Sequence, residues 1–258
     1  MDILQQRISS GILLATFNRP ERLNAFRKET FQELLDIIRF FKSDPQLRIL
    51  ALTGNGRAFS SGADLSTLGK GESEAEMREE LDLMQDLTRQ MIACDKPIVA
   101  LMNGLAVGVG VEIAMSCDLR FATNDSWIAF TEVQRGLFQT NASMYILPRL
   151  VGMGRAMDWM LSARRIPVVE LEHSGFVSAV FPAESLMPSS LERLLALERH
   201  APISMQWVKR VMWQTYELSL EAVMEKEVEG MLVCYRSEDL QEGIQAFLEK
   251  RFPDFKGK

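Results

Sequence analysis

Between Pro97 and Asp118 the chain carries a single charged residue, Glu112. Four residues that favour turns interrupt this apolar stretch: Asn103, Gly104, Gly108 and Gly110. Because a membrane-spanning helix needs about 20 uninterrupted apolar residues, the stretch is not expected to cross a membrane. It predicts instead a buried strand that ends at Asn103, a glycine-rich loop and a buried helix.

Other short apolar runs surround this stretch. Residues 12–17 and 48–53 are typical of strands, and apolar residues from Phe31 to Phe41 repeat between them at helical spacing. Two more predicted strands, at 119–122 and 127–130, follow the buried helix. Strands that alternate with helices indicate a parallel sheet covered on both faces.

The pattern changes after Pro148, where one predicted helix follows another. We therefore predict an α/β core over residues 1–190 and a C-terminal helical region over residues 191–258. The polar, glycine-interrupted stretch at 67–80 is predicted to be a mobile segment.

Length and composition bound the class of protein. The 258 residues, 47% of them hydrophobic, are enough for one broad core. The net charge is −6 and no long basic block occurs, so nucleic acid is not expected as a partner. Three scattered cysteines favour reduced thiols, and no His/Cys spacing predicts a metal site. The start, MDILQQRISSG, and the end, FKGK, resemble no export, transit or peroxisomal signal, so a cytoplasmic location is predicted.

Two glycine-rich turns, at 53–66 and 103–115, each follow a predicted strand and precede a predicted helix. Such turns expose backbone N–H groups that can hold a phosphate or a developing oxyanion. The first turn lacks the Lys-Ser/Thr pair of a phosphate-binding loop, and the second lacks the third glycine of a dinucleotide fingerprint. Both turns are therefore candidates for binding an anion other than a nucleotide.

Glu112 has two interpretations that the pattern leaves open. It is either a carboxylate that complements the start of its helix or an acid–base group whose pKa is raised by apolar surroundings. Glu132 ends a predicted strand, where α/β proteins often hold functional residues, although ordinary surface glutamates also occur there. His173 and His200 are expected to be surface or packing residues, since no nucleophile motif accompanies them.

Six motifs in order carry a resemblance to a known family: NRPERLNAF, GRAFSSGADL, KPIVALMNGLAVGVGVEIAMSCDLRFA, FTEVQRGL, LPRLVG and FLEKRFPDFKGK. Together they resemble the crotonase superfamily, the enoyl-CoA hydratase/isomerase family. The resemblance implies a twisted β-β-α superhelix and a C-terminal helical trimerisation region. It also implies homotrimers that often pair into hexamers, and a role in fatty acid metabolism.

The resemblance assigns roles to four positions. The backbone amides of Ala63 and Val109 match the family's oxyanion hole for the thioester carbonyl. Glu112 and Glu132 match the two catalytic glutamates of its hydratases, in which the first activates water and the second exchanges the proton at the α-carbon. The implied reaction is syn addition of water to a 2-enoyl-CoA, or its reverse. Coenzyme A enters as part of the substrate, so no separate cofactor is expected.

Two further segments are matched by position. The resemblance implies a coenzyme A strip that contains Arg22, Leu23, Ser61, Asp64 and Leu65. Residues 139–143, QTNAS, replace the family's glycine-rich turn after the second glutamate. Because a buried polar side chain needs a partner, we hypothesise that Gln139, Thr140 or Asn141 meets a polar or branched acyl group.

The alternatives to a hydratase come from the same family. One is another reaction of the crotonase type, such as isomerisation, specialised dehydration or hydrolysis of an acyl-CoA. A second is a homologue that binds acyl-CoA without turnover, because a fold does not determine a function.

Overall fold

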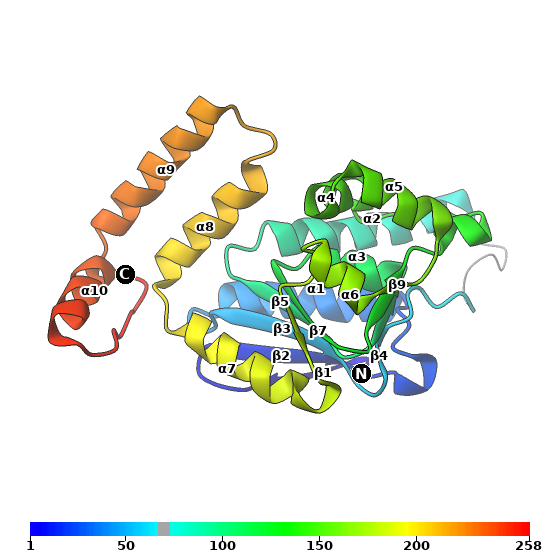
Figure 1. The fold of residues 1–258 in the computed structure, drawn as a ribbon, viewed down its shortest axis with the longest axis horizontal. Coiled ribbons are helices and arrows are strands. Elements are labelled where there is room, and N and C mark those ends of the chain that lie inside the picture. Colours follow the sequence, from blue (N-terminus) through cyan, green and yellow to red (C-terminus); the bar gives the residue numbers. More distant parts are fainter. Residues whose placement is uncertain (67–72) are drawn as a thin grey trace.

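The computed structural model describes residues 1–66 and 73–258. These residues form a core of two β-sheets surrounded by helices, from which three C-terminal helices extend (Figure 1).

The larger sheet has the strand order β1-β2-β3-β5-β7-β10. Its strands are β1 (Ile3–Arg7), β2 (Ile12–Phe17), β3 (Ile49–Gly54), β5 (Ile98–Met102), β7 (Leu119–Thr123) and β10 (Ala179–Phe181). The β1 strand is antiparallel to β2, and all other pairs are parallel. Residues of β3 and β5 are buried almost throughout because helices cover both faces, which confirms the prediction made from their continuous apolar runs.

The smaller sheet has the strand order β4-β6-β8-β9. Its strands are β4 (Ala58–Ser60), β6 (Leu105–Val107), β8 (Trp127–Ala129) and β9 (Ile166–Pro167). The chain passes from the larger to the smaller sheet in β3-β4, β5-β6 and β7-β8, and each passage leads into a helical segment. These repeated units form the β-β-α superhelix that the resemblance implied.

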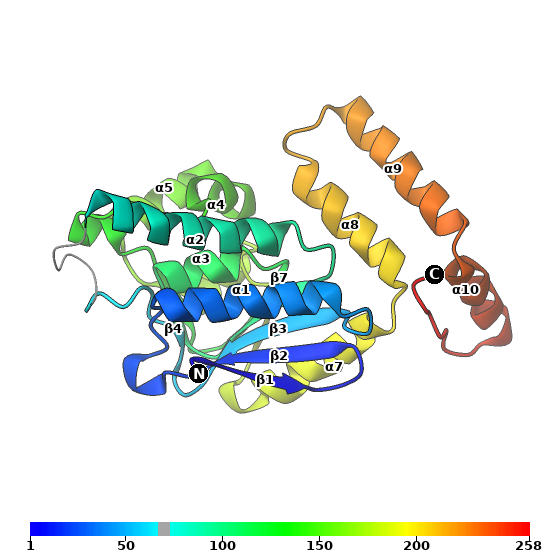
Figure 2. The ribbon, with the colours of Figure 1, turned by 180° about the vertical axis from the view of Figure 1, so that it is seen from behind.

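Helices surround the two sheets. They are α1 (Lys28–Ser43), α2 (Glu74–Ile92), α3 (Val109–Met115), α4 (Ser143–Val151), α5 (Met153–Ser162), α6 (Val168–His173) and α7 (Leu186–Glu198), with short 3₁₀ helices η1 (Pro20–Arg22), η2 (Glu132–Arg135) and η3 (Ala183–Ser185). Figure 2 shows α1 and α2 side by side, over one face of the core. Helix α7 covers the other face, where Leu186 and Leu194 pack with Ile12 and Ile49.

The structure bears on two sequence predictions. Residues 67–72 of the predicted mobile segment lie outside the described residues, but Glu74–Glu80 belong to α2, whose first turn is capped by Ser73. Helix α7 crosses the predicted boundary between residues 190 and 191 and packs on the sheet, so the extended helical region begins after Glu198.

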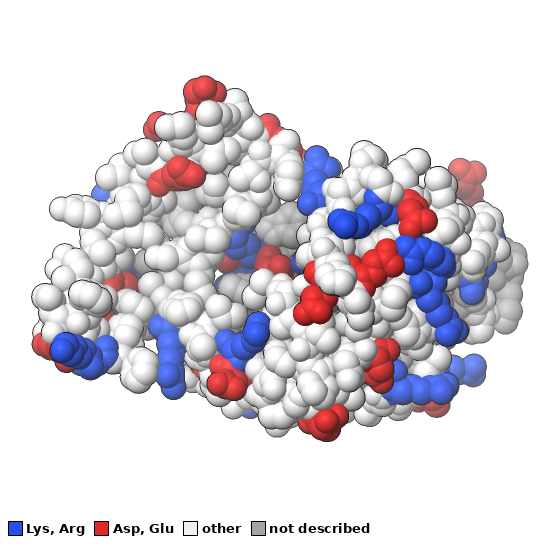
Figure 3. All heavy atoms as spheres, in the orientation of Figure 1, with Lys and Arg blue, Asp and Glu red and all other residues white. Residues whose placement is uncertain are grey.

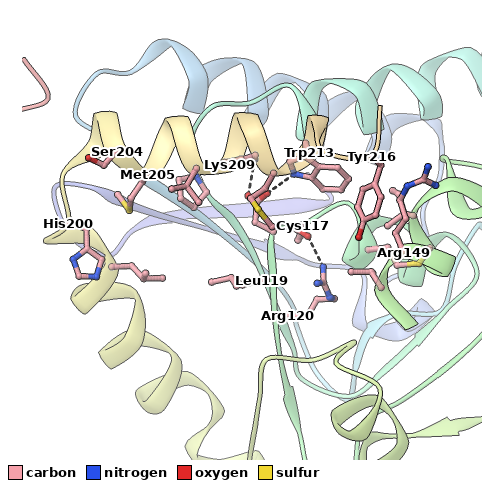
Figure 4. Close-up of a pocket in the computed structure, with 18 of the residues that line it drawn as sticks. Cys117, Leu119, Arg120, Arg149, His200, Ser204, Met205, Lys209, Trp213 and Tyr216 are labelled. Atoms are coloured by element: carbon pink, nitrogen blue, oxygen red, sulfur yellow. Dashed lines mark hydrogen bonds and ion pairs between the residues drawn. The ribbon is translucent and has the colours of Figure 1, made fainter. Parts of the chain in front are cut away.

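The C-terminal helices are α8 (Pro202–Gln214), α9 (Leu220–Tyr235) and α10 (Glu238–Glu249). Buried Lys209 of α8 forms an ion pair of 2.8 Å with Asp118, and the Trp213 indole donates to the same carboxylate at 3.0 Å. Both side chains point from α8 toward β7, into a largely apolar cavity of about 610 Å³ (Figure 4). One carboxylate therefore joins α8 to the core.

Large apolar side chains are exposed along these helices. They include Val208, Met212, Met224, Met231, Phe247 and Leu248. The face shown in Figure 3 has broad uncharged areas over α8 and α9, whereas charged side chains of both signs lie over the core. Within residues 1–66 and 73–258, no helix has the length and apolarity needed to span a membrane.

Candidate active site

A cavity of about 170 Å³ lies where the strands of the smaller sheet end. Because β4, β6 and β8 are parallel neighbours, the residues that follow them meet at one edge of the sheet. The cavity is lined by Ser61, Gly62, Ala63, Leu65, Met77, Glu80, Leu81, Met84, Val107, Gly108, Val109, Thr131, Glu132, Arg135, Leu137, Phe138 and Thr140. Six predicted site residues therefore share one cavity: Ser61, Ala63, Leu65, Val109, Glu132 and Thr140.

The segments after β4 and β6 approach each other closely at Gly62. This residue has φ +100°, and a Cβ added there would lie 2.9 Å from the Val107 carbonyl oxygen and 3.6 Å from the Val109 nitrogen. Glycine is required on both counts. Within the described residues, the amides of Ala63 and Val109 donate to no protein acceptor, whereas the neighbouring Asp64 amide donates to the Phe26 carbonyl. Two unused N–H groups thus border the same cavity.

Glu132 begins η2 directly after β8 and lines this cavity. Its Oε1 lies so close to Gly108 that a Cβ at residue 108 would be 2.7 Å away. Its Oε2 is buried and has no hydrogen-bond partner in the part of the chain described. The pKa of Glu132 is raised to about 7, chiefly by burial and also by the nearby charge of Glu112, whereas its own backbone N–H and Gln139 act in the opposite direction. Near neutral pH this carboxyl group can both give and take a proton.

Glu112 occupies a different environment, on α3 behind the cavity wall. It is 1% exposed and accepts four hydrogen bonds. Thr140 donates its backbone N–H at 2.7 Å and its hydroxyl at 2.8 Å, the Asn141 amide donates at 2.8 Å, and the Ser143 hydroxyl donates at 3.0 Å. Thr140 lines the cavity and Glu112 does not, so Thr140 lies between the Glu112 carboxylate and the cavity.

The turn at residues 139–143 contains no glycine, but two of its residues have the positive φ angles that glycine usually adopts. Asn141 has φ 48° and Ala142 has φ 58°. Asparagine tolerates this left-handed conformation better than most residues, whereas alanine adopts it at a cost of about 1–2 kcal/mol. The strained backbone directs the side chains of residues 140, 141 and 143 at Glu112.

The acyl-pocket hypothesis for Gln139, Thr140 and Asn141 stays a prediction, and the contacts of these residues bear on it. Thr140 lines the cavity, but its hydroxyl is already bound to Glu112. Asn141 is 1% exposed and also binds Glu112, and buried Gln139 lies beside Glu132. The polar residues of this turn therefore contact the side chains of Glu112 and Glu132.

The predicted coenzyme A strip is held together by backbone contacts. The Ser61 amide donates to the Leu23 carbonyl at 2.9 Å, and its hydroxyl donates to the Arg22 carbonyl at 3.2 Å. Asp64 pairs with Arg19 at 3.0 Å, and its pKa is lowered by the Ser66 hydroxyl and by Arg19. Leu65 is half exposed at the cavity. The five positions thus lie in two adjoining segments, residues 22–23 and 61–65, with Asp64 bound to Arg19.

Sequence reasoning missed several residues of the site. Ser143 binds Glu112 from the first residue of α4, and α2 supplies Met77, Leu81 and Met84 to the cavity wall. The helical spacing of these three apolar residues was a usable signal. The hydrogen bond from Ser143 has no such signal, because it depends on how α3 and α4 pack.

The fold is that of the enoyl-CoA hydratase/isomerase class. The model of the family described as enoyl-CoA hydratase/isomerase matches residues 7–258, and the chain belongs to this family. This confirms the family and the fold that the sequence predicted.

Named relatives include enzymes of both types. The chain is 32% identical to 2,3-dehydroadipyl-CoA hydratase of Escherichia coli, over 98% of this chain and 97% of that protein. It is 27% identical to the peroxisomal Δ(3,5)-Δ(2,4)-dienoyl-CoA isomerase of Arabidopsis thaliana, over 99% of this chain and 96% of that protein. The crystal structure of enoyl-CoA hydratase from Bacillus anthracis superposes with a TM-score of 0.96 at 27% identity and covers 100% of both chains. Family membership alone therefore does not determine which reaction this chain catalyses.

Proposed function

We propose that this protein is an enoyl-CoA hydratase that adds water to a 2-enoyl-CoA and gives a 3-hydroxyacyl-CoA, or catalyses the reverse dehydration. The observation that carries the proposal is the position of Glu132, whose partly buried carboxyl group, with a pKa of about 7, lines the cavity that the amides of Ala63 and Val109 border. The name of the E. coli relative, a 2,3-dehydroadipyl-CoA hydratase, agrees with this reaction.

The two amides act on the thioester oxygen. During water addition this oxygen gains negative charge as the enolate forms, so donors fixed in place stabilise the transition state more than the substrate. Removing one such donor typically costs about 10²–10³ in rate. Main-chain donors at residues 63 and 109 would serve this role whatever their side chains.

The two carboxyl groups divide the proton transfers. Glu132 delivers a proton to the α-carbon, for which a pKa near the working pH is suited. Glu112 assists the water that attacks the β-carbon. Their environments differ, since Glu112 accepts hydrogen bonds on both oxygens and Glu132 Oε2 accepts none from the described residues.

Hydration is tested by mixing the protein with crotonyl-CoA and following the loss of the conjugated thioester absorbance. We expect turnover by the natural chain and a loss of at least ~10² in Glu112→Gln and in Glu132→Gln. An active Glu132→Gln variant would remove the proposed proton donor from the mechanism.

Isomerisation of the double bond is the second candidate, and the saturation of Glu112 favours it. A single carboxyl group, Glu132, would then move a proton between the α- and γ-carbons. Incubation with a 3-enoyl-CoA distinguishes the two reactions, since an isomerase generates conjugated absorbance and a hydratase does not form it from this substrate.

We also propose that the chain assembles as a homotrimer, or as a hexamer of two trimers. The proposal is supported by the exposed apolar side chains of α8 and α10, such as Met212, Phe247 and Leu248, which another subunit would cover. Light scattering coupled to gel filtration tests this, and a monomer at micromolar concentration would contradict it.

A further inference from the structure

The carboxylate of Glu112 has no acceptor position left for a water molecule. Its Oε1 accepts from the Thr140 amide and the Ser143 hydroxyl, and its Oε2 accepts from the Thr140 hydroxyl and the Asn141 amide. An ionised carboxylate offers about four lone-pair sites, so these donors fill it. Direct activation of water by Glu112 would require one of these hydrogen bonds to break.

Thr140 connects the filled carboxylate to the cavity. It lines the cavity, whereas Asn141 and Ser143 are each 1% exposed and are absent from the described cavity wall. A hydroxyl group has one hydrogen and two lone pairs, and Thr140 gives its hydrogen to Glu112 Oε2. Toward the cavity this oxygen can therefore only accept a hydrogen bond, and it selects a group that donates one.

Unsatisfied polar atoms surround the same place. Buried Gln139 Nε2, Asn141 Oδ1 and Glu132 Oε2 find no partner among the described residues. Buried polar atoms are nearly always paired, so this cluster indicates a polar guest. Of these three residues Glu132 lines the cavity together with Thr140, so its Oε2 and the Thr140 oxygen can hold a molecule that carries a hydroxyl group, such as water or a 3-hydroxyacyl chain.

We infer that the Thr140 hydroxyl binds the attacking water, and that Glu112 acts through it as a positioning residue and final proton acceptor. This inference rests on the proposed hydratase function. The water oxygen bonds to the β-carbon, its proton passes to Thr140 Oγ1, and the proton of Thr140 passes to Glu112 Oε2. Glu132 gives its proton to the α-carbon, which takes the electron pair of the double bond. The proton on Glu112 then returns to Glu132 through solvent, which balances the cycle.

The kinetic test compares Thr140→Val with Thr140→Ser. Valine keeps the shape and the backbone N–H but removes the hydroxyl, whereas serine retains it. We expect Thr140→Val to lower kcat for crotonyl-CoA hydration by about 10² with KM changed less than about threefold, and Thr140→Ser to stay within about threefold of the natural chain. Exchange of the α-proton of butyryl-CoA with D₂O, which needs Glu132 but no attacking water, should continue in Thr140→Val.

A binding test does not depend on turnover. In the Glu132→Gln background, calorimetry compares the affinities for 3-hydroxybutyryl-CoA and butyryl-CoA. We expect a preference of about 5–10-fold for the hydroxylated ligand that is lost with Thr140→Val and kept with Thr140→Ser. Thr140→Ala serves in both tests if the valine variant does not fold.

The two proposals fail separately. Hydration or hydroxyl preference that survives in Thr140→Val would overturn the role of Thr140. A chain that does not hydrate crotonyl-CoA, but loses its hydroxyl preference in Thr140→Val, would remove the hydratase proposal and leave the hydroxyl site of Thr140 standing.

Discussion

Gly108 and Glu132 are in such close contact that no side chain fits between them. A Cβ on residue 108 would lie 2.7 Å from Glu132 Oε1, and Gly108 also has φ +52°. The second glycine-rich turn therefore does more than expose an amide, since it leaves room for the carboxyl group that follows β8.

Gly108→Ala is expected to displace Glu132 and lower hydration of crotonyl-CoA by at least ~10², because a shift of about 1 Å at a catalytic group has this effect. Gly175→Ala is the matched control. Gly175 also has positive φ, +78°, but nothing lies within 4 Å of its added Cβ. Both variants place an alanine at positive φ, so equal activities would show that the contact with Glu132 is unimportant.

Glu132 should also make stability depend on pH. Its pKa in the folded chain is about 7, against an ordinary value of 4.5, so the folded state holds this proton more tightly than the unfolded state. Its contribution is therefore fully present below about pH 4.5, decreases as the pH rises, and is lost above about pH 7. Glu132→Gln does not titrate, and we expect it to be more stable than the natural chain at pH 8 by roughly 1–2 kcal/mol, after allowance for partial exposure.

Urea unfolding of the natural chain and of Glu132→Gln at pH 5 and pH 8 measures this difference. The other titrating groups are the same in both proteins, so their effects cancel in the difference between the two free energies of unfolding. A difference that is the same at the two pH values would contradict the raised pKa of Glu132.

Glu112→Gln should destabilise the fold. A glutamine presents an NH₂ group to donors that now bind a carboxylate oxygen, which leaves buried polar groups unpaired at a cost of about 2–4 kcal/mol. The exposed Glu217, which accepts one hydrogen bond from Tyr145, provides the control, with a change of about 0.5 kcal/mol expected in Glu217→Gln. Thermal unfolding compares the variants, and equal stabilities would show that the four hydrogen bonds to Glu112 contribute little.

The strands of the core were predictable because parallel strands buried on both faces read as continuous apolar runs. The edge strand β1 was missed because its sequence, ILQQR, is mostly exposed and polar. The three-residue strands β4 and β6 lie next to glycine-rich loops and are too short for a periodic signal. At the site, Glu112 and Glu132 stood out by their position, but the hydrogen bonds from Thr140, Asn141 and Ser143 join parts of the chain whose packing no local pattern specifies.

Arg22 is expected to affect binding of the nucleotide part of coenzyme A. A guanidinium group near a phosphate strengthens ground state and transition state alike, so Arg22→Ala should raise KM for crotonyl-CoA about 3–10-fold and leave kcat unchanged. Crotonyl-pantetheine, which lacks the phosphates, is the control substrate. A KM that rises equally for both substrates would place Arg22 away from the phosphates.

The exchange of the α-proton of butyryl-CoA with D₂O, followed by NMR, tests most directly whether Glu132 and the amides of Ala63 and Val109 act on one thioester. Exchange requires an enolate and a base but no water addition. We predict exchange by the natural chain and a decrease of at least ~10² in Glu132→Gln. Exchange at the natural rate in Glu132→Gln, or none in a natural chain shown to bind butyryl-CoA, would contradict this arrangement.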